Sequence, residues 1–250
     1  MTQHEVAGAG IGKIVRSESH VRYTCQIYAP GEVARAPEPA DYAFGSFVRI
    51  PLRAGPDRVP GAEMGAAAWD ALPAADVAGP QAIATASPPG SISAVGLIYD
   101  TILVNPAYGT LGPRLSNDDQ VELFSPDYLA ERAVLVSILL LGTMAGTGRA
   151  RRVMHGVPPL APDLGAEVSP LSEAEVRAFH SFADFGAPGG ARPYLHMGYL
   201  PHAVAQDNAL LPIAMLRTIE RLERLFPENA ALLSIVKRNF SWRLKVQTAG

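Results

Sequence analysis

The sequence predicts an α+β fold, with a small β-barrel in the first half of the chain and a helical region in the second half. Short segments that alternate apolar and polar residues recur early, at residues 12–15, 21–28, 44–52 and 95–99, and most of them contain a glycine. After residue 170, apolar residues instead recur at spacings of three and four, which is typical of amphipathic helices. This change in the spacing of apolar residues predicts that strands precede helices along the chain.

The clearest predicted strand covers residues 21–28. Its odd positions share one face and its even positions the other: Val21, Tyr23, Cys25 and Ile27 against Arg22, Thr24 and Gln26. This alternation of β-favouring residues predicts a strand, and residues 45–50 repeat the pattern. Residues 92–104 form a longer apolar stretch that predicts one bent strand or two. Gly96 within it suits a β-bulge at a barrel corner.

Residues 53–91 separate two of these strands and are rich in Pro, Gly and Ala. Their apolar residues follow no period, so we expect a long insertion in the barrel that is partly disordered. Trp69 is the one bulky aromatic residue in this stretch. We expect it to anchor the insertion against the rest of the fold.

Residues 126–145 predict a buried helix that connects the barrel to the second half. Ser125 suits the N-cap, Pro126 the first helical position, and Asp127 the positive end of the helix dipole. Apolar residues from position 133 onward would cover nearly every direction around this helix, so it needs partners on several sides. The run is shorter than the ~20 residues needed to cross a bilayer, and we expect no membrane span.

The C-terminal helical region is predicted over residues 170–246. Ser172 and Glu175 form a capping box, which predicts a short helix from there to about residue 182. A second, amphipathic helix is predicted from five residues at spacings of four and three: Leu211, Met215, Thr218, Leu222 and Leu225. Pro227 ends it, and residues 228–244 predict a further helix. The last 40 or so residues therefore form an antiparallel helical hairpin.

Three segments of the first half resemble strands of the HAS-barrel family, the barrel shared by HerA-type DNA translocases and rotary ATP synthase subunits. They are residues 11–17 (IGKIVRS), 44–50 (FGSFVRI) and 94–100 (AVGLIYD). The resemblance covers residues 8–125. It implies a six-stranded barrel that, in the family, helps to set ring assembly and partner docking at the N-terminus of an ATPase.

The chain departs from that family where the ATPase core would require a phosphate-binding loop. No Gly-x-x-x-x-Gly-Lys-Ser/Thr motif occurs in the sequence. The nearest stretch, residues 142–149, lacks the lysine and the hydroxyl residue after it. We therefore expect a barrel without the ATPase core, and we expect no cofactor.

Charge and cysteine content set broad limits on the function. Residues 1–147 carry 9 Lys and Arg against 15 Asp and Glu, whereas residues 148–250 carry 12 against 9. The basic excess of the second half is too small to indicate nucleic-acid binding by itself. Cys25 is the single cysteine, and the first residues lack the charge and apolar pattern of a secretory leader. We expect a cytoplasmic protein.

Two groups of residues are candidate contacts to a partner protein or an anion. They are Tyr108 and Arg114, in a loop rich in Pro and Gly, and the basic cluster Arg149, Arg151 and Arg152. Arginine in a rigid loop offers a fixed fork of donors, and a basic cluster can contact a nucleic-acid backbone. The structural alternatives are a turn in which Arg114 pairs with Asp118 or Asp119, and a solvated linker.

Four residues raise the question of a metal or acid–base site: His180, Asp184, His196 and His202. His180 and Asp184 are four residues apart, which would let them share a helix face. The spacing between His196 and His202 does not match a familiar ligand pattern, and prolines and a glycine make the segment irregular. We expect no metal site here.

The leading hypothesis is a non-enzymatic assembly or adaptor protein that oligomerises or docks a partner, such as a DNA-processing ATPase or nuclease. It rests on the barrel pattern, the missing phosphate-binding loop and the apolar run near residue 140. One alternative is a nucleic-acid-binding protein. The other is a hydrolase or metal enzyme that uses His180, His196 and His202.

Overall fold

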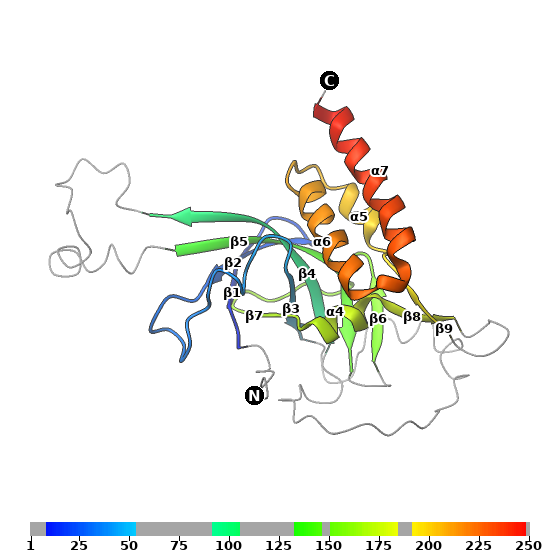
Figure 1. Cartoon of the computed structure of the whole chain (residues 1–250). Coiled ribbons are helices and arrows are strands. Elements are labelled where there is room, and N and C mark those ends of the chain that lie inside the picture. The colour runs from blue at the N-terminus through cyan, green and yellow to red at the C-terminus, as the bar shows by residue number, and fades with distance from the viewer. Residues whose placement is uncertain (1–8, 54–91, 106–132, 147–150, 185–191, 249–250) are drawn as a thin grey trace, which may run out of the picture.

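The computed structural model describes residues 9–53, 92–105, 133–146, 151–184 and 192–248. The predicted insertion lies almost entirely outside these residues. The described part is an α+β fold, as the sequence predicts, with a closed antiparallel β-barrel and a group of helices on one side of it (Figure 1). None of its helices combines the length and apolarity that a bilayer-crossing helix requires.

Six strands close the barrel. They are β1 (Gly12–Ser17), β2 (Arg22–Ile27), β3 (Phe47–Leu52), β4 (Ile92–Val104), β5 (Ala133–Ala145) and β7 (Glu167–Pro170). Neighbours around the barrel run β1, β2, β5, β4, β3, β7 and back to β1, and every pairing is antiparallel. A further strand, β6 (Arg152–His155), pairs with the last four residues of β5. The residues predicted as one bent strand or two form the single strand β4.

Two glycines allow the strands to approach one another closely. The pairing of β4 with β5 shifts register between Val95 and Gly96, which confirms the predicted bulge. A Cβ at Gly96 would lie 2.4 Å from Ile138 Cγ2, so a side chain there would collide with the core. A Cβ at Gly12 would lie 2.1 Å from the backbone oxygen of Gln26 on the neighbouring strand.

The prediction of a connecting helix over residues 126–145 is wrong. Residues 133–145 form strand β5, and residues 126–132 lie outside the described residues. The apolar run is continuous because β5 pairs with β2 and β4 and is buried over its central nine residues. A strand buried on both faces does not alternate and cannot be told from a buried helix by periodicity. The barrel therefore does not end at residue 125 but includes β5 and β7.

The C-terminal region is mainly helical. It contains α4 (Glu173–His180), α5 (Leu200–Val204), α6 (Leu211–Leu225), the 3₁₀ turn η2 (Pro227–Asn229) and α7 (Ala230–Thr248). A small hairpin of β8 (Ser181–Asp184) and β9 (Arg192–Leu195) follows α4. The predicted capping box is present, because Ser172 Oγ accepts from the Glu175 amide and the Glu175 carboxylate accepts from the Ser172 amide.

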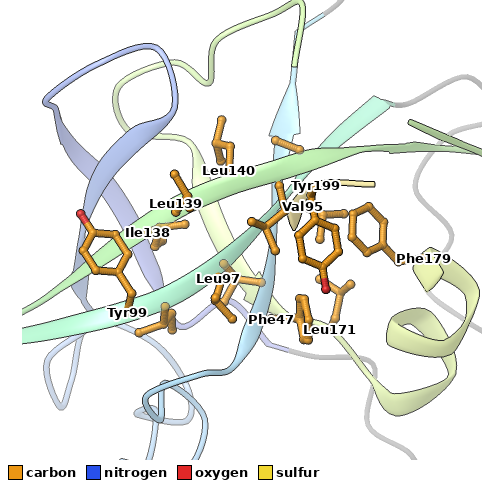
Figure 2. Packing of buried hydrophobic residues seen from close by; sticks show 14 of the residues in the cluster. Phe47, Val95, Leu97, Tyr99, Ile138, Leu139, Leu140, Leu171, Phe179 and Tyr199 are labelled. Carbon is orange, nitrogen blue, oxygen red and sulfur yellow. The ribbon is translucent and has the colours of Figure 1, made fainter. Parts of the chain in front are cut away.

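The barrel and the helices share one hydrophobic core. Figure 2 shows Val95, Leu97 and Phe47 of the barrel close to Leu171, Phe179 and Tyr199 of the C-terminal region. The Leu171 amide donates to the Phe47 carbonyl at 2.9 Å, and Arg49 Nη1 lies 2.8 Å from Glu175 Oε1. These contacts fix the start of α4 against β3.

Candidate docking surface

The ends of strands β4 and β5, residues 103–104 and 133–134, extend together beyond the rest of the barrel (Figure 1). Strand β3 pairs with β4 only as far as Leu97, and the chain before β3 adds two hydrogen bonds at Ile98. From residue 100 to residue 104, β4 continues against residues 133–137 of β5, and residues 135–137 of β5 also pair with β2. We call residues 100–104 and 133–137 the β4–β5 ribbon.

The ribbon exposes apolar side chains that the same strand buries inside the barrel. Leu97 and Ile98 have no exposed surface, whereas Ile102 is 49% exposed, Leu103 76% and Val104 38%. Among the described residues, Leu103 is the most exposed large hydrophobic residue. An apolar surface at the end of a strand, outside the core, is typical of an interaction site.

A groove of about 600 Å³ lies at the end of the ribbon. Its apolar lining comes from the ribbon, from the end of β2 and from the chain that follows β2: Ile27, Tyr28, Pro30, Pro37, Tyr42, Leu103, Val104 and Val134. The groove therefore continues the exposed apolar surface from Leu103 onto a second part of the chain. The ribbon and groove together form the best candidate docking surface in the described part of the protein.

A second notable feature is a cluster of histidines and aromatic rings where α4 meets the barrel. His180, at the end of α4, is fully buried. Its Nδ1 lies 2.7 Å from the Val176 carbonyl and must donate to it, so the neutral ring offers Nε2 as an acceptor. The Tyr199 hydroxyl donates to Nε2 at 2.8 Å. Burial lowers the pKa of His180 to about 3 and raises the pKa of Tyr199.

His155 of β6 is held in the same way. Its Nε2 donates to the Phe179 carbonyl at 2.9 Å, and its Nδ1 accepts from the Gly198 amide at 3.0 Å. Burial lowers its pKa to about 4, although the bond to Phe179 opposes that shift. The ring stacks on His196 with centroids 5.0 Å apart and an angle of 15° between planes. These histidines therefore connect β6, α4 and the segment before α5.

The structure brings His180 and His196 together, because the His196 amide donates to the His180 carbonyl at 2.9 Å, but it does not gather all of the sequence-suggested residues into one site. Both nitrogens of His180 are engaged, and His202 Nε2 donates to the Leu140 carbonyl at 3.1 Å. Helix α4 ends at His180 and Asp184 belongs to β8, so these two residues do not share a helix face. Within the described ranges, no three His, Cys, Asp or Glu residues are grouped to hold a metal ion.

The other candidate residues are only partly placed by the structure. Tyr108, Arg114 and Arg149 lie outside the described residues. Arg151 is half-buried directly before β6, and Arg152 is exposed as the first residue of that strand.

Sequence reasoning missed two groups of residues. It did not identify the exposed end of β4, although the apolar run continues past Asp100, where a strand leaving the core would be expected to turn polar. It also missed His155, which falls in a stretch that reads as a linker and is brought to His180 only by the tertiary fold.

Comparison with known proteins gives a family. No curated protein matches the chain. A family model described as "Domain of unknown function (DUF8166)" matches residues 2–57 and 81–249, which include every described strand and helix. The residues between the two matched segments fall within the predicted insertion. The chain therefore belongs to the DUF8166 family.

Proposed function

We propose that this protein is a non-enzymatic assembly or adaptor protein that associates with itself or docks a partner protein. The observation that carries the proposal is the β4–β5 ribbon, which extends from a closed barrel with Ile102, Leu103 and Val104 exposed. Burying such side chains against another protein removes apolar surface from water, which is the main driving force of association.

The resemblance to the HAS barrel supports the same function. That family uses its barrel for assembly and docking, and the barrel described here also has six strands, two of which, β5 and β7, lie outside the residues 8–125 that the resemblance covers. The partner class that follows from the resemblance is a DNA-processing ATPase or nuclease, because this chain lacks the phosphate-binding loop of its own. An adaptor that joins such an enzyme needs an interface and no catalytic residue.

The histidine cluster supports a structural rather than a chemical role for these side chains. His155 and His180 use both ring nitrogens in hydrogen bonds within the fold. A general base or a metal ligand needs a nitrogen lone pair that is open to substrate or metal. The lone pairs of these two histidines are occupied by Tyr199 and Gly198.

Light scattering coupled to size-exclusion chromatography tests the proposal. The full chain is measured alone over a wide concentration range, and again after mixing with a purified HerA-type translocase. We expect a mass above the 26.5 kDa of one chain, or co-elution with the translocase. A monomer at every concentration that also elutes apart from the translocase would contradict the proposal.

A further inference from the structure

We propose that the outer edge of β4, residues 100–104, is a self-association site that pairs antiparallel with the same edge of a second copy. The inference rests on the proposed function and narrows it, because it assigns self-association to one strand and one register. The pairing would join two β4–β5 ribbons into a continuous antiparallel sheet across the dimer.

The first argument is the backbone of this edge. One side of β4 is paired with β5 along its whole length, from Ile92 to Val104. Its other side pairs with β3, and with Gly45 and Ser46 before β3, only up to Ile98. Among the described residues, no strand pairs with that side from residue 100 to residue 104, and the Thr101 amide donates to its neighbour Asp100 Oδ1 at 2.8 Å. An edge strand presents a row of N–H and C=O groups that another extended strand can satisfy.

The second argument is the composition of the edge. Residues 101–104 are Thr, Ile, Leu and Val, which are uncharged and mostly favour strands. Proteins that avoid edge pairing usually protect such a strand with lysine, proline or a covering element. This edge has neither lysine nor proline, and all four side chains are exposed. Such an edge favours pairing.

The third argument identifies a second copy as the occupant. In a two-fold antiparallel pairing centred on Ile102, Ile102 faces its own equivalent, Thr101 faces Leu103, and Asp100 faces Val104. The three central pairs are therefore uncharged, and a carboxylate lies opposite Val104 at each end of the segment. The two Asp100 carboxylates lie at opposite ends of the paired segment, roughly 14 Å apart along the strand at ~3.4 Å per residue. That separation exceeds the Debye length of ~8 Å at physiological salt, so their repulsion is screened.

The lack of charge on this edge also argues against a charged partner. Residues 101–104 offer no charge to select an acidic or basic peptide, whereas the first half of the chain as a whole is acidic, with 9 Lys and Arg against 15 Asp and Glu up to residue 147. Two acidic halves repel one another wherever their charged surfaces meet. The uncharged edge of β4 is a place where two copies meet without that repulsion.

The amount of surface sets the strength of the contact. Three partly exposed aliphatic side chains bury well below the ~800 Å² per partner of a standard stable interface. We therefore expect a reversible dimer that forms as the protein concentration rises, not a permanent one. A lysine at one of these positions would place a charge in the pairing twice per dimer.

Sedimentation velocity over a concentration series compares the wild-type chain with Leu103→Lys. Leu164→Lys is the matched control, because Leu164 is 72% exposed, close to the 76% of Leu103, and lies outside the barrel strands. We expect the wild type and the control to dimerise alike, and Leu103→Lys to raise the dissociation constant about tenfold or more. Far-UV circular dichroism verifies that all three proteins fold.

Disulfide trapping tests the register independently. Residues directly opposite in an antiparallel pair have Cα atoms about 4.5–5.5 Å apart, within reach of a disulfide. Ile102→Cys should therefore form a covalent dimer under mild oxidation, and Leu164→Cys should do so far more slowly. The native Cys25 is fully buried, so the wild type provides a low background.

Three results would overturn the edge proposal. If Leu103→Lys dimerises like the wild type and Ile102→Cys is not trapped, self-association uses another surface and the proposed function survives. If the wild type is monomeric but co-elutes with the translocase, docking survives without this dimer. If the wild type is monomeric and Leu103→Lys alone loses thermal stability, another part of the chain covers the edge.

Discussion

Tyr199→Phe tests whether the histidine cluster holds the helical region on the barrel. The substitution removes the hydroxyl that donates to His180 Nε2 at 2.8 Å and leaves the ring, which stacks on Phe179 at 6.0 Å between centroids. His180 is fully buried, and its Nδ1 proton is committed to the Val176 carbonyl. The ring therefore cannot change tautomer to adapt, and Nε2 becomes a buried acceptor without a donor.

The expected cost follows from that unsatisfied nitrogen. A buried polar group left without its partner costs about 1–3 kcal/mol, so we expect Tyr199→Phe to lower the free energy of unfolding by about 2 kcal/mol. Urea denaturation at neutral pH measures this, provided that the slope against denaturant is unchanged. Tyr194→Phe is the control, because Tyr194 is 46% exposed and its loss should cost less than about 0.5 kcal/mol.

A double-mutant cycle with His180→Phe completes the test. If the hydroxyl and Nε2 stabilise one another, removing both should cost less than the sum of the two single losses, by about 1 kcal/mol or more. Equal stability of Tyr199→Phe and Tyr194→Phe would refute the reasoning. Strict additivity in the cycle would refute it as well.

Two further predictions concern pH and the contact between barrel and α4. The pKa values of His155 and His180, about 4 and about 3, lie below the ordinary histidine value of ~6.5. As pH falls, these two histidines therefore bind protons in the unfolded chain before they do so in the folded one. The free energy of unfolding is full above pH ~6.5 and declines toward pH ~3. A urea midpoint that stays flat between pH 7 and pH 5 would contradict this. Arg49→Gln should lower the free energy of unfolding by about 1 kcal/mol, because Arg49 lies 2.8 Å from the partly buried Glu175. Arg35→Gln, which removes the exposed ion pair between Arg35 and Glu38, should lower the free energy of unfolding by less than half as much. Equal thermal shifts for Arg49→Gln and Arg35→Gln would count against the prediction.

Local patterns predicted the strands and caps that depend on neighbouring residues. The alternation at residues 21–28 gives β2, the glycine at position 96 gives the bulge, and Ser172 with Glu175 gives the capping box of α4. In each case the signal is contained within a few residues. The fold class follows from these elements because strands precede helices along the chain.

The mistaken helix shows where that reasoning stops. Residues 133–145 are buried because β2, β4 and β6 pair with them and the core packs on them, and β2 and β4 are both distant in sequence. Ser125, Pro126 and Asp127 favour a helix start, but they say nothing of a segment that begins eight residues later. Alternating Val134, Val136 and Ile138, all β-branched, are the local signal that favours a strand.

The candidate docking surface could be predicted only in part. The apolar residues after Asp100 are visible in the sequence, but their exposure depends on where β3 stops pairing with β4. His155 and His180 are likewise 25 positions apart, and their contact depends on β6 packing beside α4. Both features arise from tertiary pairing, which one sequence does not specify.

Hydrogen–deuterium exchange as a function of protein concentration tests the central claim most directly. Backbone amides of residues 101–104 should exchange more slowly as concentration rises, because the edge of β4 becomes hydrogen-bonded in the assembled form. Amides of β1, inside the closed barrel, should not change. Exchange at residues 101–104 that is the same at every concentration, in a sample that light scattering shows to be assembled, would contradict the account.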